Sequence, residues 1–248
     1  MDLDDEKIDQ GKRNFLKAMA VMSIAAAAGG AVKGVVSNVV TPSEGLTEFP
    51  EMTLVDSSGS PIKASNWPVN SPNIWLYYYP LTDDPNFLIN LGDEKNAPLS
   101  ISSSDVTIPA NGSTFKSPGG VGPSNSIVSA SAICQHLGCV PPIIHYYSPG
   151  NSIPGHPGLL QSYKPTSGLV HCNCHGSTYD PAKGFSVVTG PTAKPLPNVI
   201  LKYNSAEDTL SVNSMTGPTI YGKVGDLSGG TPFPAGTTKT QMVNLGAV

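Results

Sequence analysis

The sequence predicts an all-β fold, and three observations support that prediction. Glycine (26 residues) and proline (24) are abundant in the chain of 248, whereas charged residues make up only 13%. Such a composition is typical of many short strands joined by turns. A hydrophobic content of 39% argues against a disordered chain. No long amphipathic helical pattern follows residue 45.

The N-terminal segment departs from this pattern. Residues 1–17 are polar, whereas residues 18–40 carry Lys33 as their only charge. At 1.5 Å per residue, a helix over 18–40 would be about 34 Å long, which is enough to cross a bilayer. We therefore expect a transmembrane anchor there. A signal peptide cleaved near Ala25–Ala27 is the alternative, because the uninterrupted apolar part is also as long as a signal-peptide core.

The residues before the apolar segment predict its orientation. Lys12, Arg13 and Lys17 precede it, and basic residues on that side place the N-terminus in the cytoplasm. Residues 12–17 resemble a twin-arginine export signal with lysine in place of the first arginine. We therefore expect a single-pass protein of the cell membrane whose remainder lies on the outer (extracellular or periplasmic) face.

The rest of the chain divides into a short linker and one domain. Residues 41–48 contain Pro42 and Gly45 and predict a flexible linker, and the domain spans 49–248. Residues 82–125 are polar and rich in turn formers, so hairpins and loops are expected there, and the tail beyond residue 213 is not assigned. Runs rich in β-branched and aromatic residues predict strands at 49–55, 74–79, 126–133, 169–170, 185–188, 199–203 and 209–212.

Charge and motifs exclude some functions. The net charge is −4 and Arg13 is the only arginine, so we expect no nucleic acid partner. The sequence contains no glycine-rich loop of the kinds that cradle nucleotide phosphates.

All four cysteines lie in two short motifs that have metal-ligand spacing. Zinc would leave at least two of the six cysteines and histidines unused, and a four-cysteine cluster would leave both histidines unused. Two cysteines on one iron and two histidines on the other use one of each per motif. The motifs read Cys134-Gln135-His136-Leu137-Gly138-Cys139 and Cys172-Asn173-Cys174-His175-Gly176-Ser177-Thr178-Tyr179-Asp180.

These motifs resemble those of the Rieske iron–sulphur proteins of cytochrome bc-type quinol-oxidising complexes. The resemblance implies a [2Fe–2S] cluster with Cys134 and Cys172 on the inner iron and His136 and His175 on the outer iron. It also implies a disulfide between Cys139 and Cys174, which suits an exported domain. The implied fold is a Rieske-type antiparallel β-sandwich with an inserted cluster-binding subdomain at about 130–197, preceded by the N-terminal helix.

Further positions match the same family. Ser177 and Tyr179 match hydroxyl donors to a bridging sulfide and a cysteine sulfur, which raise the cluster's potential. Leu137 matches an apolar side chain that shields the cluster near the quinone, and residues 190–197 resemble a proline-rich loop that covers it. Two positions depart from the commonest pattern: Gln135 stands where Thr is usual and Asn173 where Pro is usual.

The implied function is one-electron transfer. The chain would take an electron from a membrane quinol, with His136 and His175 contacting the quinol and accepting its proton, and pass it to a high-potential cytochrome or equivalent acceptor. It would act as the redox subunit of a respiratory complex beside a cytochrome b-like subunit, with the lipid bilayer holding residues 18–40. Low charge, scarce Arg and abundant Ser, Thr and Pro also resemble exterior proteins of thermoacidophilic archaea.

Three other readings remain open at this stage. The chain could be the Rieske subunit of an arsenite-oxidase-type enzyme, a Rieske ferredoxin that serves an oxygenase, or a structural zinc module in a cell-surface protein. His145, His156 and His171 are expected to be structural rather than ligands, because they lie outside the two motifs.

Overall fold

A computed structural model describes residues 46–155, 162–163, 167–223 and 230–247 of the chain. The predicted signal segment 1–17 and anchor 18–40 lie outside the described residues. The first strand begins at Leu46, inside the predicted linker 41–48. Within the described part, no helix is long and apolar enough to cross a membrane.

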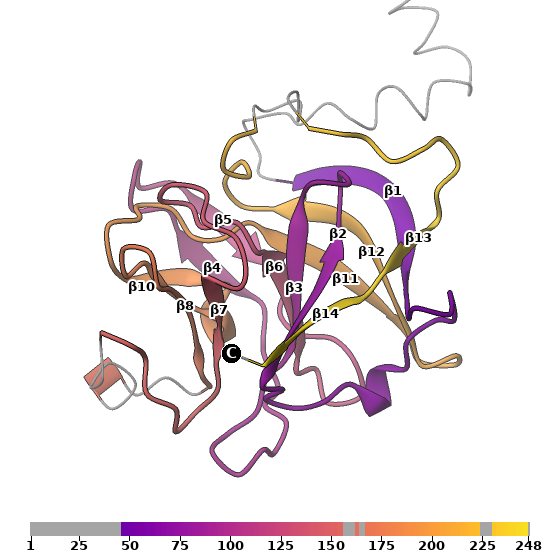
Figure 1. Ribbon diagram of the computed structural model, residues 1–248, viewed down its shortest axis with the longest axis horizontal. Coiled ribbons are helices and arrows are strands. Elements are labelled where there is room, and N and C mark those ends of the chain that lie inside the picture. The colour runs from indigo at the N-terminus through magenta and orange to yellow at the C-terminus, as the bar shows by residue number, and fades with distance from the viewer. Residues whose placement is uncertain (1–45, 156–161, 164–166, 224–229, 248) are drawn as a thin grey trace, which may run out of the picture. The chain divides into compact units, whose positions relative to one another are not determined.

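The described chain is all-β, as the sequence predicts, and its strands form three sheets (Figure 1). Eight strands form the large sheet in the order β13-β1-β12-β11-β6-β3-β2-β14, four form the order β10-β9-β8-β7, and β4 pairs with β5. Two 3-10 turns, η1 (Ala64–Asn66) and η2 (Pro181–Lys183), interrupt the strands. The strands are β1 Leu46–Val55, β2 Asn73–Tyr78, β3 Pro85–Asn90, β4 Ser104–Thr107, β5 Thr114–Ser117, β6 Ile127–Ser131, β7 Ile144–Tyr147, β8 Leu169–Cys172, β9 Thr178–Asp180, β10 Ser186–Thr189, β11 Asn198–Asn204, β12 Thr209–Thr216, β13 Lys239–Gln241 and β14 Val243–Ala247.

The large sheet is nearly closed on itself, which differs from the expected antiparallel sandwich. Its two end strands, β13 and β14, are separated only by Met242, and β13 contacts β2 near the other edge. β13 also pairs with β1 in parallel. The tail that the sequence left unassigned therefore covers both edges of the sheet.

The four-stranded sheet is an insertion between two neighbours of the large sheet. Strands β6 and β11 pair, with Ala130 opposite Asn198, and the chain between them forms β7 to β10. The region predicted as the inserted subdomain, about 130–197, covers this insertion. Strands β6 and β11, which are far apart in the sequence, thus lie side by side in the large sheet.

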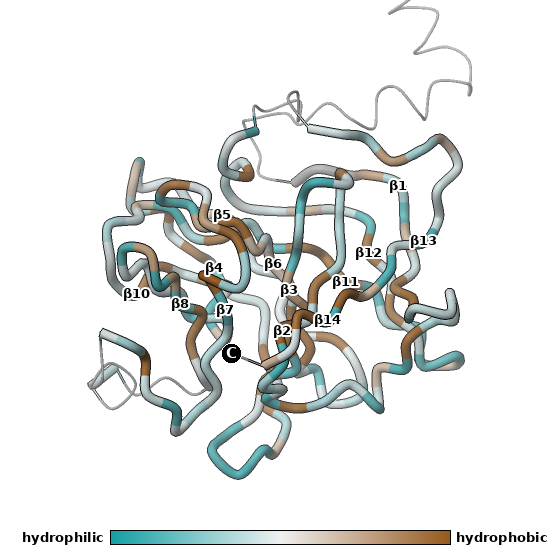
Figure 2. The backbone as a smooth tube through the Cα atoms, in the orientation of Figure 1, coloured by the Kyte–Doolittle hydropathy of each residue, from teal (hydrophilic) through white to brown (hydrophobic). Residues whose placement is uncertain are grey.

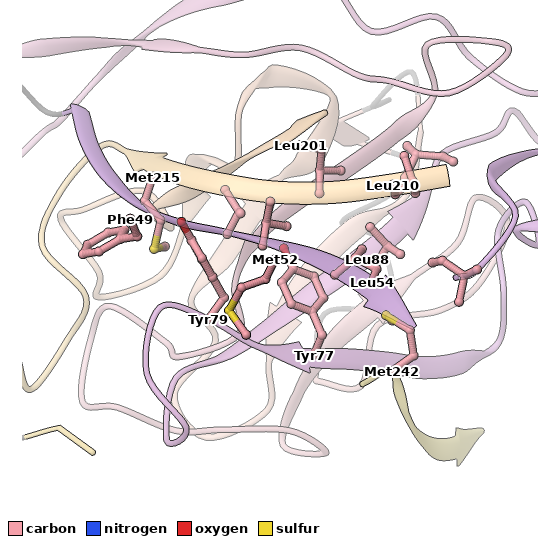
Figure 3. Packing of buried hydrophobic residues seen from close by; sticks show 14 of the residues in the cluster. Phe49, Met52, Leu54, Tyr77, Tyr79, Leu88, Leu201, Leu210, Met215 and Met242 are labelled. Atoms are coloured by element: carbon pink, nitrogen blue, oxygen red, sulfur yellow. The ribbon is translucent and has the colours of Figure 1, made fainter. Parts of the chain in front are cut away.

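The first hydrophobic core lies between β1, β2, β11 and β12. Met52 and Leu54 from β1 pack with Tyr77 from β2, with Leu201 from β11 and with Leu210 from β12 (Figure 3). Figure 2 shows that the apolar stretches of the chain follow the strands, whereas many connecting loops are hydrophilic.

The second core lies between the large sheet and the inserted one. Phe87 and Ile89 of β3 point into this core and pack with Val170 and Tyr179, whereas Leu88 between them belongs to the first core. Because both faces of β3 are buried, its residues do not alternate between apolar and polar. This central strand therefore lies in the region 82–125 that the sequence indicated only as hairpins and loops.

Candidate metal centre

The first ligand loop comprises residues 134–139 and follows β6. The N–H of Cys134 donates to the carbonyl of Cys139, and the N–H of Gly138 donates to the carbonyl of Cys134, both at 2.9 Å. Gly138 has φ +76°, a left-handed conformation that favours glycine. These bonds fold the loop into a tight turn that directs Cys134 inward and Leu137 outward.

The second ligand loop comprises residues 172–177, joins β8 to β9 and repeats the same backbone pattern. The N–H of Cys172 donates to the carbonyl of Ser177 at 2.9 Å, and the N–H of Gly176 donates to the carbonyl of Cys172 at 3.0 Å. Gly176 also has a positive φ, +85°. The two loops therefore present Cys134 and Cys172 in equivalent backbone settings.

The two inner cysteines lie in the second core and share a hydrogen bond. Each side chain is only 1% exposed. The thiol of Cys172 donates to the sulfur of Cys134 and lowers the pKa of Cys134 to about 5, and the same bond raises the pKa of Cys172. Thiolate is the form of cysteine that binds metals. The inner end of the site therefore favours the ligating thiolate form at Cys134 and the protonated form at Cys172.

The two histidines of the motifs meet at the outer end of the site. Their ring centroids are 5.0 Å apart with the planes at 84°. His136 is half-buried and His175 is exposed. Leu137, beside His136, is 56% exposed. The arrangement places sulfur donors inside and nitrogen donors toward solvent, as the family resemblance implies.

The remaining two cysteines also come together. Cys139 Sγ and Cys174 Sγ are 2.7 Å apart, and both residues are free thiols here. One ligand atom of His175 lies within 4.8 Å of both sulfurs. A single metal ion at this trio would leave the two buried sulfurs of the core unused. The predicted disulfide between Cys139 and Cys174 stays a prediction.

Two hydroxyl groups point at the inner cysteines. The backbone N–H of Gln135 donates to Tyr179 Oη at 3.1 Å, so the hydroxyl proton of Tyr179 is free to donate to Cys134 Sγ, 3.3 Å away. Ser177 is 1% exposed, and its Oγ has no N or O hydrogen-bond partner among the residues that the structure describes, although its proximity to Cys134 contributes to the lowered pKa of that thiol. A buried hydroxyl without a partner is costly. Ser177 therefore indicates that an acceptor belongs beside Cys134 and Cys172.

The donor set thus fits a two-iron centre better than a mononuclear one. Two buried sulfurs, two outward imidazoles and an unpartnered hydroxyl suit a group that has a sulfide acceptor between its irons. Residues 114–200 match the family model of the Rieske [2Fe-2S] domain. The chain contains a Rieske [2Fe–2S] domain. Such a domain carries a [2Fe–2S] cluster, and the assignment of Cys134, His136, Cys172 and His175 as its four ligands stays a prediction.

A solved structure also resembles the chain. It is the crystal structure of the soluble domain of the Rieske protein II (soxF) from Sulfolobus acidocaldarius, which is 26% identical. The match covers 74% of this chain and 85% of that chain, with a TM-score of 0.46.

The Rieske domain compensates for one departure from the family pattern. Asn173, where Pro is usual, exchanges two hydrogen bonds with Tyr147 Oη, accepting at 3.1 Å and donating at 3.0 Å. Its backbone N–H also donates to Ile143 O at 2.9 Å. The loop is therefore held by bonds to the insert rather than by a proline ring. For Gln135 the side chain is buried, and its Nε2 has no partner among the described residues.

The loop predicted to cover the cluster, residues 190–197, starts against the second ligand loop. Gly190 has φ +98°, and a Cβ added there would lie 2.5 Å from Gly176 O and from Ser177 Cα. Glycine is therefore required by both conformation and space. The sequence indicated only a proline-rich connection, and the close backbone contact gives this segment a definite place beside the site.

The three other histidines fall where the sequence placed them or outside the described chain. His145 and His171 pair across β7 and β8. His145 Nδ1 lies 2.8 Å from Pro142 O, and burial lowers the pKa of this histidine. His171 Nδ1 lies 2.8 Å from Thr178 Oγ1. His156 lies outside the described residues.

Sequence reasoning missed three tyrosines near the site. Tyr147 holds Asn173, and Tyr163 donates to the buried carboxylate of Asp180 at 3.1 Å. Tyr221, from the unassigned tail, lies against Gly138. Each contact joins segments that are distant in the sequence, so no local pattern could have revealed it. Only the aromatic character of these residues in turn-rich segments was a signal.

Proposed function

We propose that this chain accepts one electron from a membrane quinol and passes it to a cytochrome-type acceptor, as the Rieske subunit of a bc-like respiratory complex. The bound [2Fe–2S] cluster supplies a one-electron acceptor and donor. The protein's part is to bind the quinol, exclude water and take its proton. The observation that carries the proposal is the exposed apolar surface at the two ligand loops, which also carry the outward imidazoles.

Exposed apolar side chains gather at the ligand loops. Among the described residues, five large apolar side chains are exposed, and four of them lie in or against these loops. Leu137 belongs to the first loop and Val140 follows it, Ile143 accepts the backbone bond from Asn173, and Tyr221 packs on Gly138. An exposed apolar patch marks a binding surface. This patch suits a lipid-soluble quinol in an apolar pocket of a membrane subunit.

The imidazoles supply the polar contact that a quinol needs. A quinol hydroxyl donates a hydrogen bond and gives up its proton as the electron leaves. A solvent-facing ring nitrogen of His136 or His175 can accept this hydrogen bond and then the proton, when that nitrogen is deprotonated. Apolar side chains around the rings keep water from competing for the hydroxyl. The chain's own residues thus orient the donor and take its proton.

A redox titration of the full-length, cluster-loaded protein tests this proposal. We expect a midpoint potential above zero that is flat at low pH and falls at high pH by about 59 mV per unit, for one proton per electron. Rapid mixing with a short-chain quinol should reduce the cluster, as followed by electron paramagnetic resonance. A potential well below zero with no reduction by quinol would favour a ferredoxin, and a pH-independent potential would contradict proton transfer to the imidazoles.

We further propose that residues 18–40 anchor the protein in the cell membrane, with residues 1–17 in the cytoplasm and the Rieske domain outside. The length and the preceding basic residues of this segment support the proposal. The protein should stay with membranes through a high-pH carbonate wash, and protease added to intact cells or spheroplasts should cut the domain. Release by the wash would contradict the anchor, and protection from the protease would contradict the orientation.

A further inference from the structure

The tail segment 220–223 reaches the first ligand loop from outside the Rieske match at 114–200. A Cβ added to Gly138 would lie 2.8 Å from both Cδ1 and Cε1 of Tyr221. The tyrosine ring therefore covers the open face of this glycine. Gly138 lies two residues after His136 and directly before Cys139, so the ring rests on the outer half of the loop.

The turn that carries Tyr221 is fixed on both sides of the ring. Ile220 is 4% exposed and belongs to the first core, and Lys223 N–H donates to Ile220 O at 3.0 Å. The ammonium of Lys223 pairs with Asp83 and lies 3.6 Å from Asp84, whose side chain is fully buried. A buried charge pair resists separation, because either charge alone would be costly to bury. Ile220 and Lys223 therefore hold Tyr221 in place against the loop.

The first loop needs such a support more than the second does. Asn173 binds the second loop to Tyr147 through its side chain. For residues 136–138 of the first loop, the described part of the chain offers no hydrogen bond to another segment. The Tyr221 ring is the contact that takes this place.

We propose that Tyr221 is a positioning residue for the first ligand loop, whose ring fixes the outer half of the loop and thereby the orientation of the His136 imidazole. The ring acts by contact, and the hydroxyl has no part in it. This inference goes beyond the proposed quinol reaction, because it concerns how the ligand is held and not what reduces the cluster.

Substitution of Tyr221 in the full-length, cluster-loaded protein tests the inference. Tyr221→Ala should keep its iron and its fold, because the side chain is 38% exposed. It should broaden the electron paramagnetic resonance lines of the reduced protein and release iron to a chelator several times faster than wild type, because the loop is no longer held in one geometry. Tyr221→Phe should match wild type in both measurements, and Tyr221→Leu should fall between them.

Tyr203→Ala is the matched control. Tyr203 is a half-buried tyrosine of β11 that packs on the first core and donates to Asp208, so it tests the loss of a tyrosine away from the loop. Wild-type line widths and iron release in Tyr221→Ala would overturn the inference. Equal changes in Tyr203→Ala would overturn it as well, and so would loss of the whole fold in both the Ala and Leu variants, since that would assign Tyr221 to the core. None of these readouts involves a quinol, so they stand apart from the proposed reaction.

Discussion

The two ligand loops have the same backbone hydrogen bonds but are secured in different ways. In the first loop the two residues after Cys134 are buried or half-buried, whereas Asn173, Cys174 and His175 of the second loop are all exposed. The first loop is covered by an aromatic ring, and the second is held by side-chain bonds and by the backbone contact at Gly190. Similar local geometry is thus stabilised by contacts that the family motif does not specify.

Within each ligand loop, substitution of the two cysteines should have the most different effects on cluster binding. Cys134→Ser and Cys172→Ser should each abolish cluster binding, because a serine oxygen is a poorer ligand than thiolate for an iron–sulfur centre. Cys139→Ser and Cys174→Ser should keep the iron and lower the thermal stability. Iron and acid-labile sulfide analysis would check this. Equal loss of iron in all four variants would contradict the division into ligands and disulfide.

At Gly190, the close contact with the second ligand loop should contribute more to stability than the positive φ does. Gly190→Ala places a methyl group against the backbone of the second loop, which cannot move aside cheaply. We expect the free energy of unfolding to fall by about 3 kcal/mol. Gly59 has a similar φ, +81°, with nothing near its Cβ position, so Gly59→Ala should cost only about 1 kcal/mol. Denaturant unfolding of the two variants gives the comparison, and equal losses would show that the contact with the second loop is unimportant.

Asp84, which lies beside Lys223 in the support of the first loop, should make the stability of the protein depend on pH. Burial raises the pKa of Asp84 to about 6, although Lys223 opposes the shift. The folded state therefore binds a proton that the unfolded state does not bind between pH 4 and 6, and stability falls as the pH rises through this range. The full shift corresponds to about 3 kcal/mol, of which about 2 kcal/mol should be lost between pH 4 and pH 6. Asp84→Asn should remove it.

The measurement is the unfolding free energy of wild type and Asp84→Asn at pH 4, 5 and 6. The difference between the two proteins isolates Asp84, because His145 titrates in both. The lowered pKa values of Glu51 and Asp83 act mainly below pH 4. A difference that does not change with pH would contradict the assignment.

The hydroxyls should produce the smallest effects, one for each loop. Ser177→Ala removes a donor from the second loop, and Tyr179→Phe removes the donor to Cys134 in the first. Each variant should keep the cluster and lower its midpoint potential by about 40 mV, the equivalent of one hydrogen bond of about 1 kcal/mol. Potentiometric titration would show whether both loops are tuned. Unchanged potentials in both variants would exclude such hydrogen bonds.

The sequence predicted the parts of the molecule that rest on local patterns. The motifs predicted that Cys134 would lie beside Cys172 and His136 beside His175, as the structure has them, and the assignment of all four as ligands stays a prediction. Alternating or β-branched runs marked the strands that carry them. Strand β3 was not predicted, because both of its faces are buried. Asn86 and Asn90 lie inside, and no alternation of apolar and polar residues remains. The near-closure of the large sheet was not predicted, because β13 and β14 are short and follow a long turn-rich tail.

Contacts that position the ligand loops could not be predicted in the same way. Asn173 stood out only as a departure from the family pattern, and its bonds to Tyr147 depend on the register of β7 against β8. Tyr221 and Lys223 act through partners more than eighty residues away in the chain. Such pairs follow from the tertiary fold, and one sequence does not reveal them.

The closing of the large sheet also has a consequence for handling the protein. Strands β13 and β14 cover the outer edges of β1 and β2, which would otherwise offer rows of unpaired N–H and C=O groups. Deletion of residues 239–247 would bare both edges at once and invite neighbouring copies to join edge to edge. Shortened versions of the domain should therefore keep these last strands to remain free of aggregates.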